Sequence, residues 1–152
     1  MTGRHTNALD STIKTLIEDV IPFNHHLGLK VATIDRAAGS ITLTLAVRGE
    51  HIGNVVRGMP HGGLIAALVD GASGAAAALT LDDLSYAPTV ATIDMRVDFL
   101  RPGRGAELKA VATVMRSGRS VIVVRTEVFD ADGALLAIGS SAFTVERGPR
   151  DE

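Results

Sequence analysis

The stretch from His61 to about Leu81 constrains the fold most, because it contains no proline and is rich in Ala, Gly and Leu. It predicts the longest helix of the chain. Residues 41–47 before it alternate apolar and polar side chains with a period of two, which is typical of a half-buried strand. Near the N-terminus, residues 9–21 repeat apolar side chains at helical spacing, and this pattern predicts a first helix that ends at Pro22.

The remaining chain reads as strands on both sides of the long helix. Strand-like segments separated by turn-forming residues occupy 29–35, 89–100, 107–116, 120–129 and 135–145. A meander of strands with one central helix predicts the α+β class, with an antiparallel sheet covering one long helix. The 152 residues contain no internal repeat or linker, so we expect one domain over 1–152. Within it, residues 1–22 are expected to carry an N-terminal helix and 148–152 a polar tail.

Composition excludes several classes of function. The formal net charge is −2, and no polybasic segment is present, which argues against nucleic acid or a membrane surface as a partner. The chain has no cysteine, so disulfides, thiolate catalysis and Cys-based metal sites are excluded, and its histidines lack metal-ligand spacing. No apolar run approaches the ~20 residues that a membrane span needs, and residues 1–10 do not resemble a signal peptide. We therefore expect a soluble, cytoplasmic protein without a metal.

The long helix has one face made of small residues around a single carboxylate, Asp70. On a helical wheel, the residues within about 60° of Asp70 are Gly63, Ala66, Ala67, Ser73, Gly74 and Ala77. The opposite side is largely aliphatic and suits the sheet: it carries Leu64, Ile65, Leu68, Ala72 and Leu79. A solvated surface Asp would normally have Lys and Glu around it, and this face has none. Asp70 is therefore a candidate catalytic group.

The helix begins at His61-Gly62-Gly63, where free backbone N–H groups and the positive end of the helix dipole can hold an oxyanion. The tripeptide alone also fits an ordinary loop-to-helix junction. Gly62 and Asp70 are eight residues apart, or ~12 Å along the helix axis. One carbonyl group cannot contact both within one chain. If both serve one reaction, two chains must pair with their helices antiparallel, giving a dimer with two equivalent sites.

These residues resemble a known family. Gly58-Met59-Pro60-His61-Gly62-Gly63 followed by Leu68-Val69-Asp70 is similar to the G-x-x-H-G-G-x-x-x-x-L-x-D signature of hotdog-fold thioesterases. The similarity is greatest to the phenylacetate-degradation (PaaI-like) and thioesterase superfamily member 2-like group. Further matches follow in order at Thr92-Ile93-Asp94-Met95, Phe99-Leu100-Arg101-Pro102, Ser117-Gly118-Arg119, Asp132-Gly133 and Ala137-Ile138-Gly139. The resemblance spans about residues 23–145.

The resemblance implies an acyl-CoA thioesterase that needs no cofactor beyond the coenzyme A of its substrate. It implies that Asp70 acts as general base or nucleophile and that the Gly62 N–H holds the thioester oxygen. His61 would support the helix start, and Thr92 would lie near the carboxylate. The family commonly has Asn three residues before Gly58, where this chain has Val55 and the neighbouring Asn54. A homo-oligomer is implied, with the dimer required for the site and a tetramer expected.

Other residues are expected to contact the substrate, and two other functions remain open. The expected contacts are Asn54, Gly63, Ser73, Arg101, Gly118 and Arg119, the arginines through the CoA phosphates. The first alternative is a non-catalytic acyl-CoA-binding module, which the shifted Asn54 motivates. The second, an enoyl-CoA hydratase, ranks last because His61 lies too far along the helix from Asp70. The acyl group cannot be read from the sequence.

Overall fold

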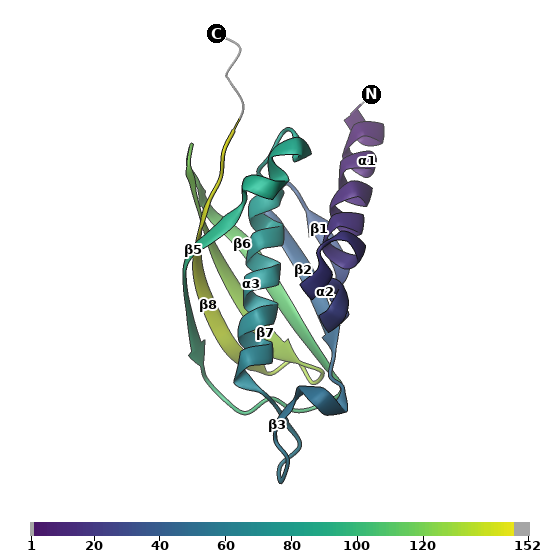
Figure 1. The fold of residues 1–152 in the computed structure, drawn as a ribbon, viewed down its shortest axis with the longest axis vertical. Coiled ribbons are helices and arrows are strands. Elements are labelled where there is room, and N and C mark those ends of the chain that lie inside the picture. Colours follow the sequence, from purple (N-terminus) through teal and green to yellow (C-terminus); the bar gives the residue numbers. More distant parts are fainter. Residues whose placement is uncertain (1, 148–152) are drawn as a thin grey trace.

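A six-stranded antiparallel sheet wraps around one central helix in the computed structural model, which describes residues 2–147 (Figure 1). The central helix α3 spans Gly62–Ala78 and lies in the concave face of the sheet. The strand order is β1-β2-β6-β7-β8-β5. The strands are β1 (Lys30–Asp35), β2 (Ser40–Ala46), β5 (Ala91–Phe99), β6 (Glu107–Ser117), β7 (Val121–Asp130) and β8 (Leu135–Thr144). The expected α+β hotdog architecture is confirmed.

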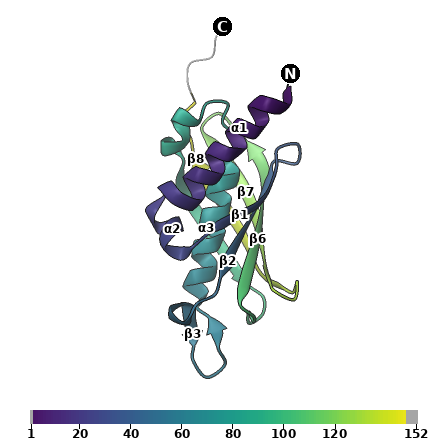
Figure 2. The same cartoon turned by 90° about the vertical axis from the view of Figure 1, so that its right-hand side faces the viewer.

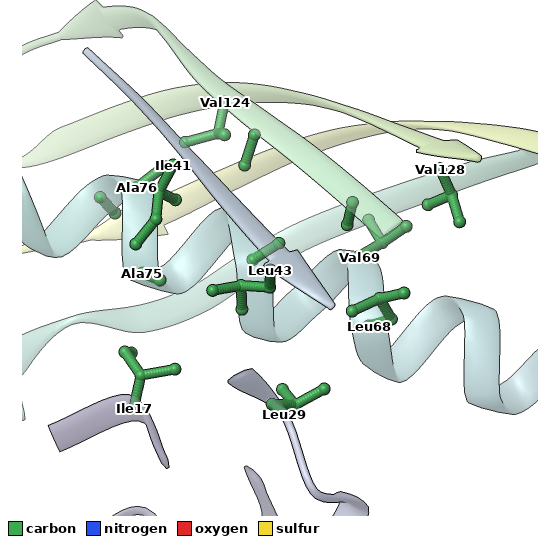
Figure 3. Close-up of a cluster of buried hydrophobic side chains, with 14 of the residues drawn as sticks. Ile17, Leu29, Ile41, Leu43, Leu68, Val69, Ala75, Ala76, Val124 and Val128 are labelled. Carbon is green, nitrogen blue, oxygen red and sulfur yellow. The ribbon is translucent and has the colours of Figure 1, made fainter. Parts of the chain in front are cut away.

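The side of α3 that faces the sheet forms the hydrophobic core (Figure 3). Leu68, Val69 and Ala76 on α3 are fully buried and meet sheet residues such as Val124 and Val128. Packing is close enough that a Cβ on Gly139 of β8 would collide with the Val69 side chain. The expected aliphatic side of the long helix is confirmed as the side that covers the sheet. No helix among residues 2–147 has both the length and the apolar character that crossing a membrane would require.

The N-terminal helix differs from its expected pattern. Helix α1 (Thr2–Thr15) continues into a π-helical turn, η1 (Leu16–Val20). The expected stripe holds for Ile13 and Ile17, which are buried, but Val20 is 59% exposed. A π turn takes more residues per turn than an α-helix, so the side chains after Leu16 rotate away from the predicted face.

Pro22 begins a second helix, whereas the sequence predicted only that the first helix ends there. It is the first residue of the short helix α2 (Pro22–Leu27), a position where the missing N–H costs nothing. The helix ends at Gly28, whose φ of 76° favours glycine. Leu27 and Leu29 are buried, so this segment packs into the core beside α3 (Figure 2). The chain therefore continues as a second helix directly after the predicted helix end at Pro22.

Glu18 ties η1 to the first strand. Its carboxylate accepts hydrogen bonds from the Val31 N–H at 2.8 Å and from Lys30 Nζ at 3.1 Å. Burial by itself would raise the pKa of Glu18, but these two hydrogen bonds and the charges of Lys30 and Lys14 outweigh it and hold the pKa below 4.5. The carboxylate therefore anchors the N-terminal segment against β1.

A small hairpin precedes α3 and projects beyond the end of the sheet (Figures 1 and 2). Its strands are β3 (Ile52–Asn54) and β4 (Met59–Pro60), and the short helix η2 (Gly49–His51) leads into it. After α3, the short helix η3 (Leu84–Thr89) leads to β5. The hairpin therefore joins the end of β2 to the start of α3.

Candidate active site

Asp70 and Thr92 are brought into direct contact. Thr92 Oγ1 on β5 donates a hydrogen bond to Asp70 Oδ1 on α3 at 2.8 Å. Asp70 is partly exposed, and its Oδ2 accepts no hydrogen bond from the described residues. The hydroxyl therefore orients the carboxylate, while one carboxylate oxygen remains available to a molecule that enters from outside.

The surface around Asp70 is lined by residues without large side chains. We call it the open face of α3 and define it as Gly63, Ala66, Ala67, Asp70, Gly71 and Gly74, all at least partly exposed. It is bordered on one side by Thr92 of β5. On the other side Leu29 and Asn24 lie against Gly71. A face made of such small residues allows another backbone or a ligand to approach the helix closely.

Ser73 does not lie on the open face, which corrects its expected placement. Its side chain has no exposed surface and points toward the sheet. Ser73 Oγ lies 2.8 Å from Thr126 Oγ1 and accepts a hydrogen bond from Ser141 Oγ at 3.3 Å. Ala77 is buried as well. The sheet wraps further around α3 toward β5 than the wheel centred on Asp70 suggested, so Ser73 is not placed to contact a substrate.

The start of α3 presents one unpaired amide. His61 is the N-cap, and its Nδ1 accepts the Gly63 N–H at 2.8 Å, so the Gly63 amide is engaged. The His61 N–H itself donates to the His51 carbonyl at 2.8 Å. Within residues 2–147 the Gly62 N–H donates to no acceptor. His61 therefore supports the helix start and leaves Gly62 as the candidate oxyanion donor.

A surface hollow of about 430 Å³ adjoins Gly62. Its lining combines apolar residues of the hairpin and of the β5 end with one cation: Met59, Pro60, Gly62, Ile65, Phe99, Leu100, Arg101, Pro102 and Gly103. The ring of Phe99 lies 3.5 Å from where a Cβ on Gly62 would stand. Arg101 and Gly62, expected to act on the same ligand, are thus brought together.

Asn54 and the Gly118-Arg119 turn lie elsewhere. Asn54 Oδ1 accepts the Arg57 N–H at 3.1 Å and so stabilises the turn of the projecting hairpin. The β6–β7 turn is closed by the Gly118 N–H donating to the Val121 carbonyl at 2.9 Å. Arg147 donates to both Ser117 Oγ and the Thr80 carbonyl, which places this turn at the C-terminal end of α3. Within one chain, Arg119 therefore lies at the opposite end of α3 from Gly62.

Asn24 was missed by sequence reasoning. It lies in α2, is only 6% exposed, and approaches Gly71, the residue after Asp70. A signal existed, since Pro22 can begin a helix and would place Asn24 on the same face as Leu27, three residues later.

The described residues contain no group of three or more His, Cys, Asp or Glu side chains that could hold a metal ion.

Comparison with known proteins identifies the architecture. The family model of the thioesterase superfamily matches residues 57–137, which include Gly62, Asp70 and Thr92. The medium/long-chain acyl-CoA thioesterase YigI of Salmonella typhimurium is 30% identical over 135 residues, covering 82% of this chain and 86% of that protein. Human acyl-coenzyme A thioesterase 13 is 29% identical over 136 residues, covering 88% of this chain and 91% of that protein.

A solved structure agrees with these relatives. A Shewanella oneidensis protein described as related to the thioesterase superfamily superposes with a TM-score of 0.82 at 28% identity. The alignment covers 95% of this chain and 99% of that one. The similarity therefore extends over the whole hotdog domain, including the N-terminal helices that the family model does not match.

Proposed function

This chain belongs to the thioesterase superfamily and is a thioester hydrolase, and from that premise we propose that it hydrolyses acyl-CoA thioesters to a free acid and CoA, with Asp70 as the catalytic carboxylate. The names of its relatives support acyl-CoA as the substrate class. The observation that carries the proposal is the Thr92–Asp70 hydrogen bond at 2.8 Å, because it holds a carboxylate in a fixed orientation with one oxygen free.

The proposed site combines two protomers. Asp70 of one chain would act opposite Gly62 of the partner subunit, since the ~12 Å between them along one helix prevents both from contacting one carbonyl. Two features support this pairing. The open face of α3 has no side chain larger than that of Asp70, so no bulky group on it blocks a second helix. In addition, β5 is an edge strand with apolar side chains in solvent: Ile93 is 57% and Phe99 55% exposed. Such an edge is a surface on which a second copy can pair.

The proposed chemistry begins with attack on the thioester carbonyl carbon. In one route the Asp70 carboxylate takes a proton from a water molecule while the water oxygen attacks the carbonyl carbon. In the other route the carboxylate attacks directly and forms an anhydride, which water then hydrolyses. In both, the amide of Gly62 from the partner subunit stabilises the oxyanion, and the C–S bond breaks to release CoA as a thiolate that takes up a proton. No metal or further cofactor takes part in either route.

The ends of the CoA substrate would be held by cations near the site. An antiparallel pair brings the Gly62 end of one chain toward the C-terminal half of α3 in the other. Arg101 of one chain and Arg119 of the partner would then lie at the same end of the site. Guanidinium groups bind phosphates by paired hydrogen bonds, so these two arginines are the proposed contacts of the CoA phosphates.

The decisive experiment is to measure hydrolysis of a panel of acyl-CoAs by the wild type and by Asp70→Asn. The variant keeps the size of the side chain and a hydrogen-bond acceptor for Thr92, but it cannot take a proton or attack. We expect kcat to fall by at least about 10²-fold, with an unchanged thermal midpoint. Asp82→Asn, an exposed carboxylate just beyond α3, is the matched control and should retain full activity. A loss below tenfold in Asp70→Asn would remove Asp70 from the chemistry.

A second function, non-catalytic binding of acyl-CoA, is favoured by one observation. Asn54 Oδ1 accepts the Arg57 N–H of its own hairpin turn, so this oxygen is not available to orient a water molecule. Calorimetry with an acyl-CoA would separate the two functions. Tight binding without release of free CoA over hours would favour the binding module over the enzyme.

A further inference from the structure

Strand β5 forms a free edge of the sheet (Figure 1). It stands last in the order β1-β2-β6-β7-β8-β5, and all nine of its residues are at least partly exposed. A free edge presents backbone N–H and C=O groups with which another strand can pair. If that strand is a second copy of β5 running antiparallel, the two-fold axis passes through one residue, which lies opposite its own copy. The register of the pair is therefore defined by the residue on the axis.

The outer face of β5 carries three charges of alternating sign, those of Asp94, Arg96 and Asp98. They point away from α3, because Met95 and Val97 between them pack against the core and side chains alternate along a strand. All three charged residues are exposed. Their neighbours on β8 are uncharged: Ala142, Ser140 and Ile138. Strand β8 therefore offers these charges no partner, and the free side of β5 is where one can be placed.

Within one chain, these charges are paired only in part. Arg96 donates to Asp98 Oδ1 from Nε at 3.1 Å and from Nη2 at 2.9 Å. The Asp94 carboxylate forms no hydrogen bond or ion pair with another residue in the range 8–147. An ion pair between exposed side chains is weak, so Arg96 can be shared with a second carboxylate at little cost. An arriving strand can therefore add an opposite-charge pair across from Asp94.

Among the registers centred on residues 94–98, charge favours two. With Met95 on the axis, Asp94 of each chain lies opposite Arg96 of the partner subunit. With Val97 on the axis, Arg96 lies opposite Asp98 of the partner subunit. Each of these registers makes two opposite-charge pairs. An axis through any of the three charged residues places that residue opposite its own copy, and like charges directly opposite are destabilising.

The geometry of the site decides between these two registers. The Phe99 ring lies beside Gly62, 3.5 Å from where a Cβ would stand, while Thr92 binds Asp70. With Met95 on the axis, Phe99 of the partner subunit reaches the level of residues 91–92 and brings the start of its helix to Asp70. With Val97 on the axis, Phe99 of the partner subunit lies opposite Met95, three residues or ~10 Å from Thr92. Only the first register completes the site.

We propose that two copies of this chain pair through β5 with Met95 on the two-fold axis, and that the ion pairs between Asp94 and Arg96 of the partner subunit select this register. The inference rests on the proposed two-chain site and defines the contact that assembles it. The charges on the outer face of the sheet thus determine where the oxyanion donor of one chain meets the carboxylate of the other on the inner face.

The first test uses the absence of cysteine from the chain. Met95→Cys, Arg96→Cys and Val97→Cys each supply one thiol per protomer. Opposite residues of an antiparallel pair have Cα atoms about 4.5–5.5 Å apart, within the range of a disulfide, and Cα atoms more than about 7 Å apart cannot be bridged. On a non-reducing gel after mild oxidation, we expect Met95→Cys to give at least tenfold more linked dimer than the other two variants. The linked dimer should keep the thioesterase activity of its reduced form.

The second test reverses charges and measures the dimer Kd by analytical ultracentrifugation. Asp94→Arg faces Arg96 of the partner subunit twice, so Kd should rise about tenfold or more. Adding Arg96→Asp restores opposite charges and should return Kd to within about threefold of the wild type. Asp98→Asn, on the same face of the strand, is the control and should leave Kd within about twofold. These values decide the register even if Met95→Cys does not fold.

Other outcomes separate this inference from the proposed function. Preferential linking through Arg96→Cys or Val97→Cys, or a tighter dimer in Asp94→Arg, would overturn the register and leave the thioesterase function standing. A linked Met95→Cys dimer that is inactive beside an active reduced form would show that this register is not the productive one. Linking at Met95 without hydrolysis of any acyl-CoA by the wild type would instead overturn the proposed function. A wild type that stays monomeric at every concentration would overturn both the two-chain site and this inference.

Discussion

The two sides of α3 carry opposite kinds of residue. Toward the sheet, Leu68 and Val69 are fully buried, and the polar side chain of Ser73 is paired with Thr126. On the open face, Asp70 stands among glycine and alanine and is partly exposed. One side gains stability by removing large apolar surface from water, while the other gives up that gain and keeps a carboxylate accessible.

The difference suits a helix that serves the core on one side and the proposed site on the other. Glycine within a helix costs roughly 0.5–1 kcal/mol relative to alanine, so Gly71 and Gly74 weaken α3 locally. The buried contacts on the sheet side offset that cost and keep the helix straight beneath Asp70. The carboxylate is therefore placed by a packed helix, and the two glycines allow Leu29 and Phe143 to pack closely against it.

The largest expected effects concern the open face and the proposed two-chain site. Gly62→Pro removes the candidate oxyanion N–H at the first helical position, where proline is tolerated. We expect it to lower kcat by about 10²–10³-fold. Mixing it with Asp70→Asn should restore activity, because half of randomly mixed dimers are hybrid and each hybrid has one intact site of two. Recovery of about a quarter of wild-type activity is the expected result.

The control for this mixture is each variant mixed with itself, which should stay inactive. Subunit exchange is followed by native mass spectrometry. If hybrid dimers form and activity does not return, Gly62 and Asp70 do not share a site across two chains.

The next largest effect belongs to the sheet side. Leu68→Ala removes a fully buried side chain and should lower the free energy of unfolding by about 2–5 kcal/mol. Urea denaturation measures this change in stability. Activity per folded molecule, measured by kinetics at matched folded fractions, should be unchanged. The reciprocal change, Ala66→Leu on the open face, should leave stability nearly unaltered and abolish activity, because the partner's helix can no longer approach. If both variants lost stability and activity to the same extent, the proposed difference between the two sides of α3 would be contradicted.

The smallest effect distinguishes Ser73 from the proposed catalytic residues. Ser73→Ala leaves the buried Thr126 hydroxyl without its partner and should lower the free energy of unfolding by about 1–3 kcal/mol. Because Ser73 faces the sheet, kcat and KM should stay within twofold of the wild type. A large rise in KM with unchanged stability would return Ser73 to the substrate site.

The fold could be predicted from the sequence because its signals are local. Period-two alternation places the strands within a few residues of their observed bounds, and the proline-free run from His61 marks α3. The His61-Gly62-Gly63 start and the carboxylate of Asp70 are likewise visible in the sequence, since capping and helical spacing depend on residues only a few positions apart. The prediction of a second chain follows from the rise of a helix, if Gly62 and Asp70 serve one reaction.

Only the tertiary structure decided which side of each element is covered. The π turn at Leu16 rotated Val20 into solvent, and the extent of the sheet buried Ser73, which the helical wheel had grouped with Asp70. The Thr92–Asp70 contact and the position of Asn24 join segments more than twenty residues apart. These placements depend on how far the sheet curls and where α2 packs. The curl of the sheet and the position of α2 are set by contacts across the whole domain, and no local stretch of sequence encodes them.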